Sequence, residues 1–135
     1  MALQLSVAVR NAMLDAIETT IGTSAVLKIR TGAPPASVAT ADSGTVLATL
    51  TLPSDWMAAA SAGSKAKNGT WEDASADAAG TAAHYRIYAS DGTTAPWQGP
   101  VTATGGGGEM TVDNVVFAAG QSFSITSFSL SAANS

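Results

Sequence analysis

Residues 6–30 have the sequence SVAVRNAMLDAIETTIGTSAVLKIR, and the spacing of their apolar residues changes at Gly22. Before Gly22 the large apolar side chains recur about every four positions, which is typical of a helix with one buried face. After Gly22 the apolar Leu27 and Ile29 alternate with polar residues, as in a strand that buries one face. This stretch therefore predicts a helix over residues 6–21 and a chain that continues in strands.

The predicted helix has favourable residues at both ends and an apolar stripe along its length. Ser6 is a good N-cap residue, and Gly22 readily adopts the left-handed conformation that ends a helix. We expect the stripe to be buried in ordinary packing; it contains Val9, Met13, Leu14, Ile17 and Ile21. The charged residues of the helix should then face solvent; they are Arg10, Asp15 and Glu18.

Short strands are predicted along most of the remaining chain. The clear ones cover residues 25–30, 45–52, 83–89, 98–104, 110–112, 115–117 and 122–130. The middle of the chain, residues 58–82, is rich in Ala, Ser and Gly, and we predict two weak strands near Trp56 and Trp71. Strands about ten residues apart are typical of a sandwich or barrel. We expect a single domain over residues 1–135, with the helix over 6–21 and an antiparallel β-sandwich over 24–131.

Composition and charge argue against several functions. The 135 residues include no cysteine, one histidine and only 12% charged residues, with a formal net charge of −4. A chain without cysteine forms no disulfide, thiolate metal site or thiol nucleophile. Net negative charge opposes nucleic-acid binding, and no stretch approaches the roughly 18 apolar residues of a membrane span. We expect no nucleic-acid partner, no membrane and, without a secretion signal, a soluble protein made in a cytoplasm.

Few residues could carry chemistry. His84, the sole histidine, is predicted to be partly exposed on a strand, and no Gly-x-Ser-x-Gly elbow accompanies it. The acidic residues Glu72, Asp73 and Asp77 lack the pattern of a calcium loop, although a small hydrolase built on them is a third hypothesis. We therefore predict no catalytic residue, no metal, no cofactor and no enzymatic activity.

Several loops are predicted from glycine, proline and lysine. Glycines 105–108 should form a flexible or tightly turned connection, because a phosphate loop would end in lysine and a helix. Lys65 and Lys67 should lie at a solvated loop tip. Trp97 follows Pro96 in a predicted loop, where its ring could contact a partner or a sugar.

The chain resembles a group of small virion proteins of tailed phages and prophages, of the capsid decoration or cement type. The resemblance lies in Leu5 to Gly22, with Arg10-Asn11-Ala12 and Asp15-Ala16-Ile17-Glu18, and in residues 27–33 (LKIRTGA), 50–53 (LTLP), 80–87 (GTAAHYRI) and 120–122 (GQS) before Phe123 to Leu130. It implies a jelly-roll-like sandwich on the outside of the assembled shell, at junctions between major capsid protein subunits.

Our leading hypothesis is therefore a non-enzymatic decoration protein that stabilises the capsid exterior of a virion and is made in the bacterial host cytoplasm. Its partners would be the major capsid protein and further copies of itself, in a dimer or trimer, because repeated modest contacts add up over a lattice. Trp97 and Arg10 are the candidate partner-contact residues. The alternative is a tail- or fibre-associated virion protein with a carbohydrate-binding surface.

Overall fold

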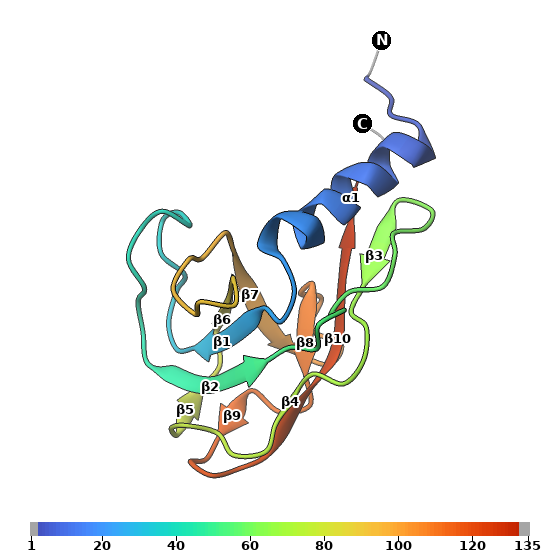
Figure 1. Ribbon diagram of the computed structural model, residues 1–135. Coiled ribbons are helices and arrows are strands. Elements are labelled where there is room, and N and C mark those ends of the chain that lie inside the picture. Colours follow the sequence, from blue (N-terminus) through green and yellow to red (C-terminus); the bar gives the residue numbers. More distant parts are fainter. Residues whose placement is uncertain (1–2, 133–135) are drawn as a thin grey trace.

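The computed structural model describes residues 3–132 and is mainly β, with one helix near the N-terminus (Figure 1). The helix is α1 (Val7–Ile21). The strands are β1 (Val26–Arg30), β2 (Val46–Thr51), β3 (Ser64–Ala66), β4 (Glu72–Asp73), β5 (Gly80–Thr81), β6 (His84–Tyr88), β7 (Trp97–Ala103), β8 (Met110–Val112), β9 (Val116–Phe117) and β10 (Phe123–Ser131). The predicted fold class, a β-sandwich-like fold with one N-terminal helix, is confirmed. Residues 1–2 and 133–135 of the predicted domain lie outside the described part of the chain.

One curled sheet makes up most of the fold. It has eight strands in the order β2-β1-β6-β7-β8-β10-β3, with β4 paired to β10, while β5 and β9 form a second, two-stranded sheet. Neighbouring strands are antiparallel, as predicted, except for β7 and β8, which are parallel. α1 projects from one end of this β body, beside β3 and the end of β10 (Figure 1).

The strands predicted from alternating patterns begin and end within one residue of their predicted bounds. The middle of the chain, for which the sequence predicted only weak strands, forms short strands. Trp56, just before it, and Trp71, within it, attach this segment to the core. Both indoles are buried, and each ring nitrogen donates to a backbone carbonyl. The Nε1 atom of Trp56 lies 2.9 Å from the oxygen of Gly22, and that of Trp71 lies 3.1 Å from the oxygen of Asn68. These bonds satisfy polar atoms that burial would otherwise leave unpaired.

Five aromatic side chains form the centre of the core: Trp56, Trp71, Tyr85, Trp97 and Phe128. Neighbouring ring centroids lie 5.1 to 6.4 Å apart, in the tilted or edge-on orientations that aromatic pairs favour. The prediction that Trp97 lies in a loop is wrong, because Trp97 begins β7 and is half-buried. The Trp97 ring belongs to this cluster and packs against Phe128, with the two ring centroids 5.1 Å apart.

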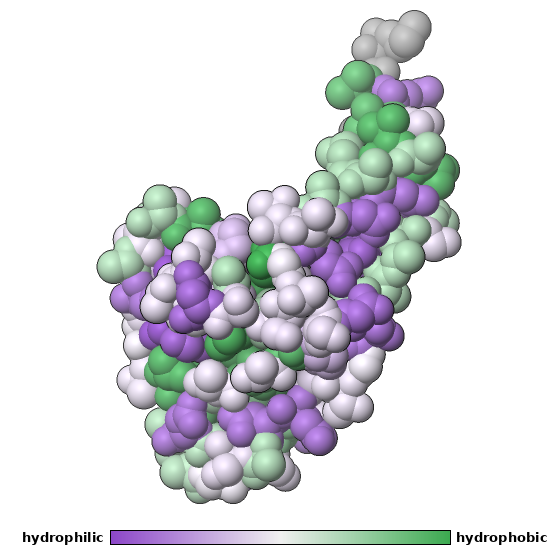
Figure 2. Space-filling view, in the orientation of Figure 1, coloured by the Kyte–Doolittle hydropathy of each residue, from purple (hydrophilic) through white to green (hydrophobic). Residues whose placement is uncertain are grey.

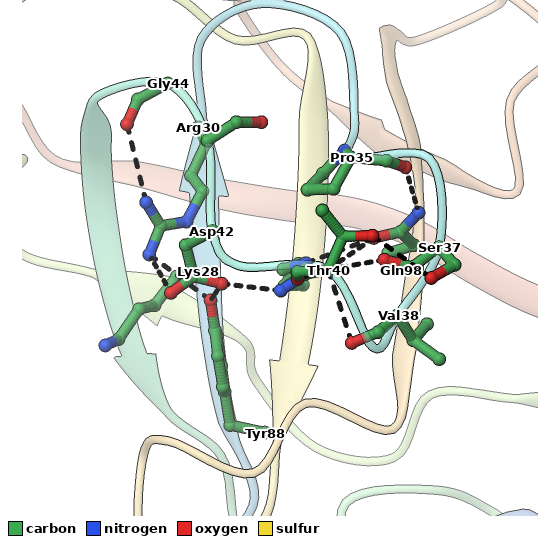
Figure 3. A network of polar contacts seen from close by, with 12 residues as sticks. Lys28, Arg30, Pro35, Ser37, Val38, Thr40, Asp42, Gly44, Tyr88 and Gln98 are labelled. Carbon is green, nitrogen blue, oxygen red and sulfur yellow. Dashed lines mark hydrogen bonds and ion pairs between the residues drawn. The ribbon is translucent and has the colours of Figure 1, made fainter.

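β6 is buried on both faces, which the sequence did not predict. We expected His84 to be partly exposed, yet its exposed fraction is 0%, and all five residues of the strand are buried. The physical reason is that the connection between β1 and β2 folds back over this face of the sheet (Figure 3). Gly32, Pro34 and Pro35 in this connection predict a surface loop, but they do not show that it covers the sheet.

The glycines 105–108 form a tight turn rather than a flexible linker. They join β7 to the parallel β8 through residues 104–109, whereas parallel neighbours usually need a dozen or more residues between them. The chain doubles back against Thr102, and a Cβ on Gly106 would lie 2.8 Å from the Cβ of Thr102. Glycine is required there because the Thr102 side chain and the oxygen of Ala103, at 3.0 Å, occupy the space that a side chain would need.

The face of α1 that packs on the β body differs from the predicted one. Leu14 and Ile21 are buried as expected, but Val9 and Met13 have exposed fractions of 45% and 52%. The charged side of the helix instead faces the β body. The predicted stripe therefore splits into a buried half and a half that remains open to solvent.

Candidate functional site

The connection between β1 and β2, which we call the clamped loop (residues 31–45), is held on the sheet by Arg86 of β6. The Arg86 side chain is 2% exposed and comes from the middle of β6. Its guanidinium donates to the carbonyl oxygens of Ser37 at 3.0 Å, Val38 at 3.4 Å and Thr40 at 2.9 Å, and to the side chains of Asp42 and Gln98. One buried cation thus fixes three backbone carbonyls of the loop, within residues 37–40.

Asp42 joins the clamped loop to a second buried arginine. Its two carboxylate oxygens accept from Arg86 at 2.7 Å and from Arg30 at 2.8 Å, and the hydroxyl of Tyr88 donates to it at 2.9 Å. Burial alone would raise the pKa of Asp42, but the hydrogen bonds from Arg86 and Tyr88 and the two positive charges outweigh it and lower the pKa. The carboxylate therefore stays ionised at neutral pH.

Two further contacts fix the ends of the clamped loop. The side-chain amide of Gln98 donates to the oxygen of Pro35 at 2.7 Å, and Thr45 donates its backbone N–H to the hydroxyl of Thr31 at 2.9 Å. The loop is therefore ordered by contacts before any partner arrives. Its exposed side chains are small and mostly apolar, apart from Asp42; they include Ala33, Pro34, Ala36, Ser37, Val38, Ala39, Thr40 and Ala41.

His84 supports the start of the clamped loop. Its Nδ1 lies 2.7 Å from the oxygen of Gly32, and since a carbonyl only accepts, the proton must sit on Nδ1. The other ring nitrogen, Nε2, is buried without a hydrogen-bond partner. Burial is the main cause that lowers the pKa of His84, with Arg30 and Arg86 nearby adding to it. The ring is accordingly neutral at neutral pH and serves as a donor to the loop.

α1 is locked to the β body through Lys65, which we had predicted to be solvated. That prediction is wrong: the Lys65 side chain is 2% exposed, and its ammonium lies 2.7 Å from Asp15 and 2.9 Å from Glu18. Burial alone would lower the pKa of Lys65, but the hydrogen bonds that its ammonium donates to both carboxylates raise the pKa overall. A buried ammonium is tolerated here because both carboxylates and the oxygen of Ala58 pair with it.

Backbone groups near β3 bind the same side of α1. Asp15 accepts from the backbone N–H of Ala60 at 3.0 Å, and Asn11 accepts from that of Gly63 at 2.9 Å. The guanidinium of Arg10 donates to the oxygen of Ala132 at 3.4 Å. The prediction that these charged residues face solvent is therefore wrong for Arg10 and Glu18, whereas Asp15 contacts the β body and remains 46% exposed. The sequence did contain a signal for this contact. Successive residues of a helix are rotated by about 100°, and this rotation places the three charged residues on one side of α1.

An apolar groove lies on the other side of α1. Its volume is about 430 Å³, and it is lined by Met13, Ala16, Ile17, Thr20, Ile21, Pro96, Trp97 and Leu130. Figure 2 shows apolar side chains gathered over the projecting helix. Trp97, one of the two candidate contact residues, lines this groove, whereas Arg10, the other, lies on the bound side of α1. With Thr20 as its main polar neighbour, the groove favours an apolar occupant over a sugar.

Two of the acidic residues considered for calcium or hydrolysis, Asp73 and Asp77, are bound by the same strand residue, Thr49. Asp73 and Asp77 both accept from Thr49, one from its backbone N–H at 3.2 Å and the other from its hydroxyl at 2.9 Å. Within residues 3–132, no three His, Asp or Glu side chains gather in a way that could hold a metal ion. In the same range, no helix is long and apolar enough to cross a membrane.

Comparison of the chain with protein-family models, with curated proteins and with solved structures found no match. Function is therefore inferred from the two surfaces described above: the clamped loop and the groove beside α1.

Proposed function

We propose that this protein is a non-enzymatic phage structural protein that binds the outer surface of the assembled capsid and stabilises it. The observation that carries the proposal is the clamped loop. Two buried arginines, a shared carboxylate and a glutamine fix a loop of small, mostly uncharged residues in one conformation. The resemblance of the sequence to decoration proteins supports the same partner, the major capsid protein.

A fixed loop is suited to this role because binding need not order it. Ordering a flexible side chain or loop at an interface costs free energy, and a pre-ordered loop avoids most of that cost. Val38 is 42% exposed and flanked by small residues, so the loop offers a shallow apolar contact. Many such contacts, repeated over identical capsid subunits, give strong attachment from modest individual affinities.

The proposal is tested by binding to capsid shells that lack this protein. Val38→Asp places a charge at the centre of the loop without removing any contact of the clamp, so the fold should remain intact by circular dichroism. We expect at least about tenfold weaker co-sedimentation with shells, equivalent to about 1.4 kcal/mol per site. Val116→Asp is the matched control, because Val116 is 58% exposed on β9 and should bind like the wild type.

Equal binding of the Val38→Asp and wild-type proteins would refute the role of the loop. Electron cryomicroscopy of the virion tests the location directly. Density for this protein on the capsid exterior is expected, and density only in the tail would favour the tail or fibre alternative instead.

A further inference from the structure

The two sides of α1 differ in a way that packing within one chain does not explain. The three charged residues of the helix all lie on the side that contacts the β body. The opposite side carries no charge; its residues are Ala8, Val9, Ala12, Met13, Ala16 and Thr20. A helix face without charge, exposed along its whole length, is unusual for a surface in contact only with water.

Exposed apolar side chains are concentrated at this end of the molecule. Of the six large apolar residues that are exposed in the described chain, four lie in α1 or just before it: Leu3 at 74%, Val7 at 46%, Val9 at 45% and Met13 at 52%. The groove beside α1 continues this surface toward Trp97. Contiguous apolar patches of this kind mark protein contacts.

We propose that the occupant of this surface is α1 of a second copy of the chain, packed antiparallel about a two-fold axis at Met13. A two-fold interface uses the same patch twice, so the patch must contain both the protruding and the receiving parts. Here Val9 and Met13 protrude, and the groove lined by Ile17 and Trp97 receives. With Met13 on the axis, Val9 of one copy lies opposite Ile17 of the other.

The charge and size of the patch fit this occupant. An uncharged face pairs best with another uncharged face, and α1 itself supplies one. Ala12 and Ala16 leave room for two helix axes to approach to about 8 Å, the short end of the usual range. A specific interface buries at least about 1,000 Å² in total, so the contact must extend beyond the helix to the groove lined by Trp97 and Leu130. Leu3, before the helix, extends the contact toward the groove of the partner copy.

The absence of cysteine from the sequence allows a clean test of this geometry. In a Met13→Cys variant the only two thiols of a pair would meet at the two-fold axis. We expect mild oxidation to convert most of this variant to a disulfide-linked dimer. Val116→Cys, equally exposed but on β9, is the control and should stay largely monomeric. Equal cross-linking of the two variants would overturn the proposal.

Sedimentation equilibrium of the cysteine-free protein, without shells, gives a second readout. We expect a mass of twice 13.4 kDa at micromolar concentrations. Met13→Asp should weaken the pairing at least tenfold while circular dichroism shows an intact helix. A monomer at about 100 µM, or a trimer, would overturn the proposal. Val38→Asp should still pair, so failure of shell binding and failure of pairing are distinguishable.

Discussion

Replacement of Arg86 by methionine tests whether the clamped loop depends on one buried cation. Methionine has a similar length and fills part of the space, but it removes the donors to three loop carbonyls, to Asp42 and to Gln98. Removing one partner from a buried ion pair typically costs about 3 to 5 kcal/mol. Part of the loop can recover hydrogen bonds with water, because Asp42 is 38% exposed. We therefore expect a loss at the lower end, about 3 kcal/mol.

The loss is measured by urea unfolding and by thermal unfolding followed by circular dichroism. For a chain of this size, about 3 kcal/mol corresponds to a fall of about 10 °C in Tm. Limited proteolysis should show new cleavage within the clamped loop at temperatures where the β body remains folded, because the loop loses its anchors first.

Lys28→Met is the matched control for the Arg86 variant. Lys28 also lies on the sheet, but its ammonium makes one bond, to the oxygen of Gly92 at 3.3 Å, and lies 4.9 Å above the ring of Tyr88. We expect a loss of about 1 kcal/mol or less. If the Arg86 and Lys28 variants lose equal stability, or if the loop resists protease in both, the clamp does not hold the loop as described.

Two further predictions concern buried charges. Lys65→Met leaves Asp15 and Glu18 without their cation and should cost about 3 kcal/mol, with early proteolysis near α1; a helix that stays protected would contradict the anchoring role. In the wild type the hydrogen bond from Lys65 lowers the pKa of Asp15, so this anchor should persist above pH 3.8 and weaken as pH falls further through the lowered pKa. The pKa of His84 is also lowered, mainly by burial, so stability should fall as pH drops below 6.5, by at most about 1.4 kcal/mol per pH unit. His84→Gln keeps a donor for Gly32 and should flatten that dependence, and an unchanged slope would show that another group titrates.

The strands were predictable because alternation is a local property. Each β-strand side chain points to one face or the other, so Leu27 and Ile29 or Phe123 and Ile125 show their burial in the sequence itself. The helix bounds were predictable for the same reason, since Ser6 accepts from the N–H of Val9 at 3.2 Å as an N-cap should.

Burial of charge was not predictable because it depends on distant partners. Arg86 contacts loop residues 44 to 49 positions earlier in the chain, and Lys65 contacts Asp15 at a separation of 50. A pattern read over a window of ten residues assigns both side chains to solvent. Of the candidate site residues, Trp97 was chosen for exposure and proves half-buried at the groove, while Val38 was missed because alanine- and proline-rich loops show no periodic signal.

The short connection between β7 and β8 has a consequence for the order of folding. The three pairs Val101 with Met110, Thr102 with Thr111 and Ala103 with Val112 each join residues only nine positions apart. Closing so small a loop loses little chain entropy, and contacts of low sequence separation form fastest. β7 and β8 can therefore associate early in folding. β10 then pairs with β8, and the distant β3 pairs with β10.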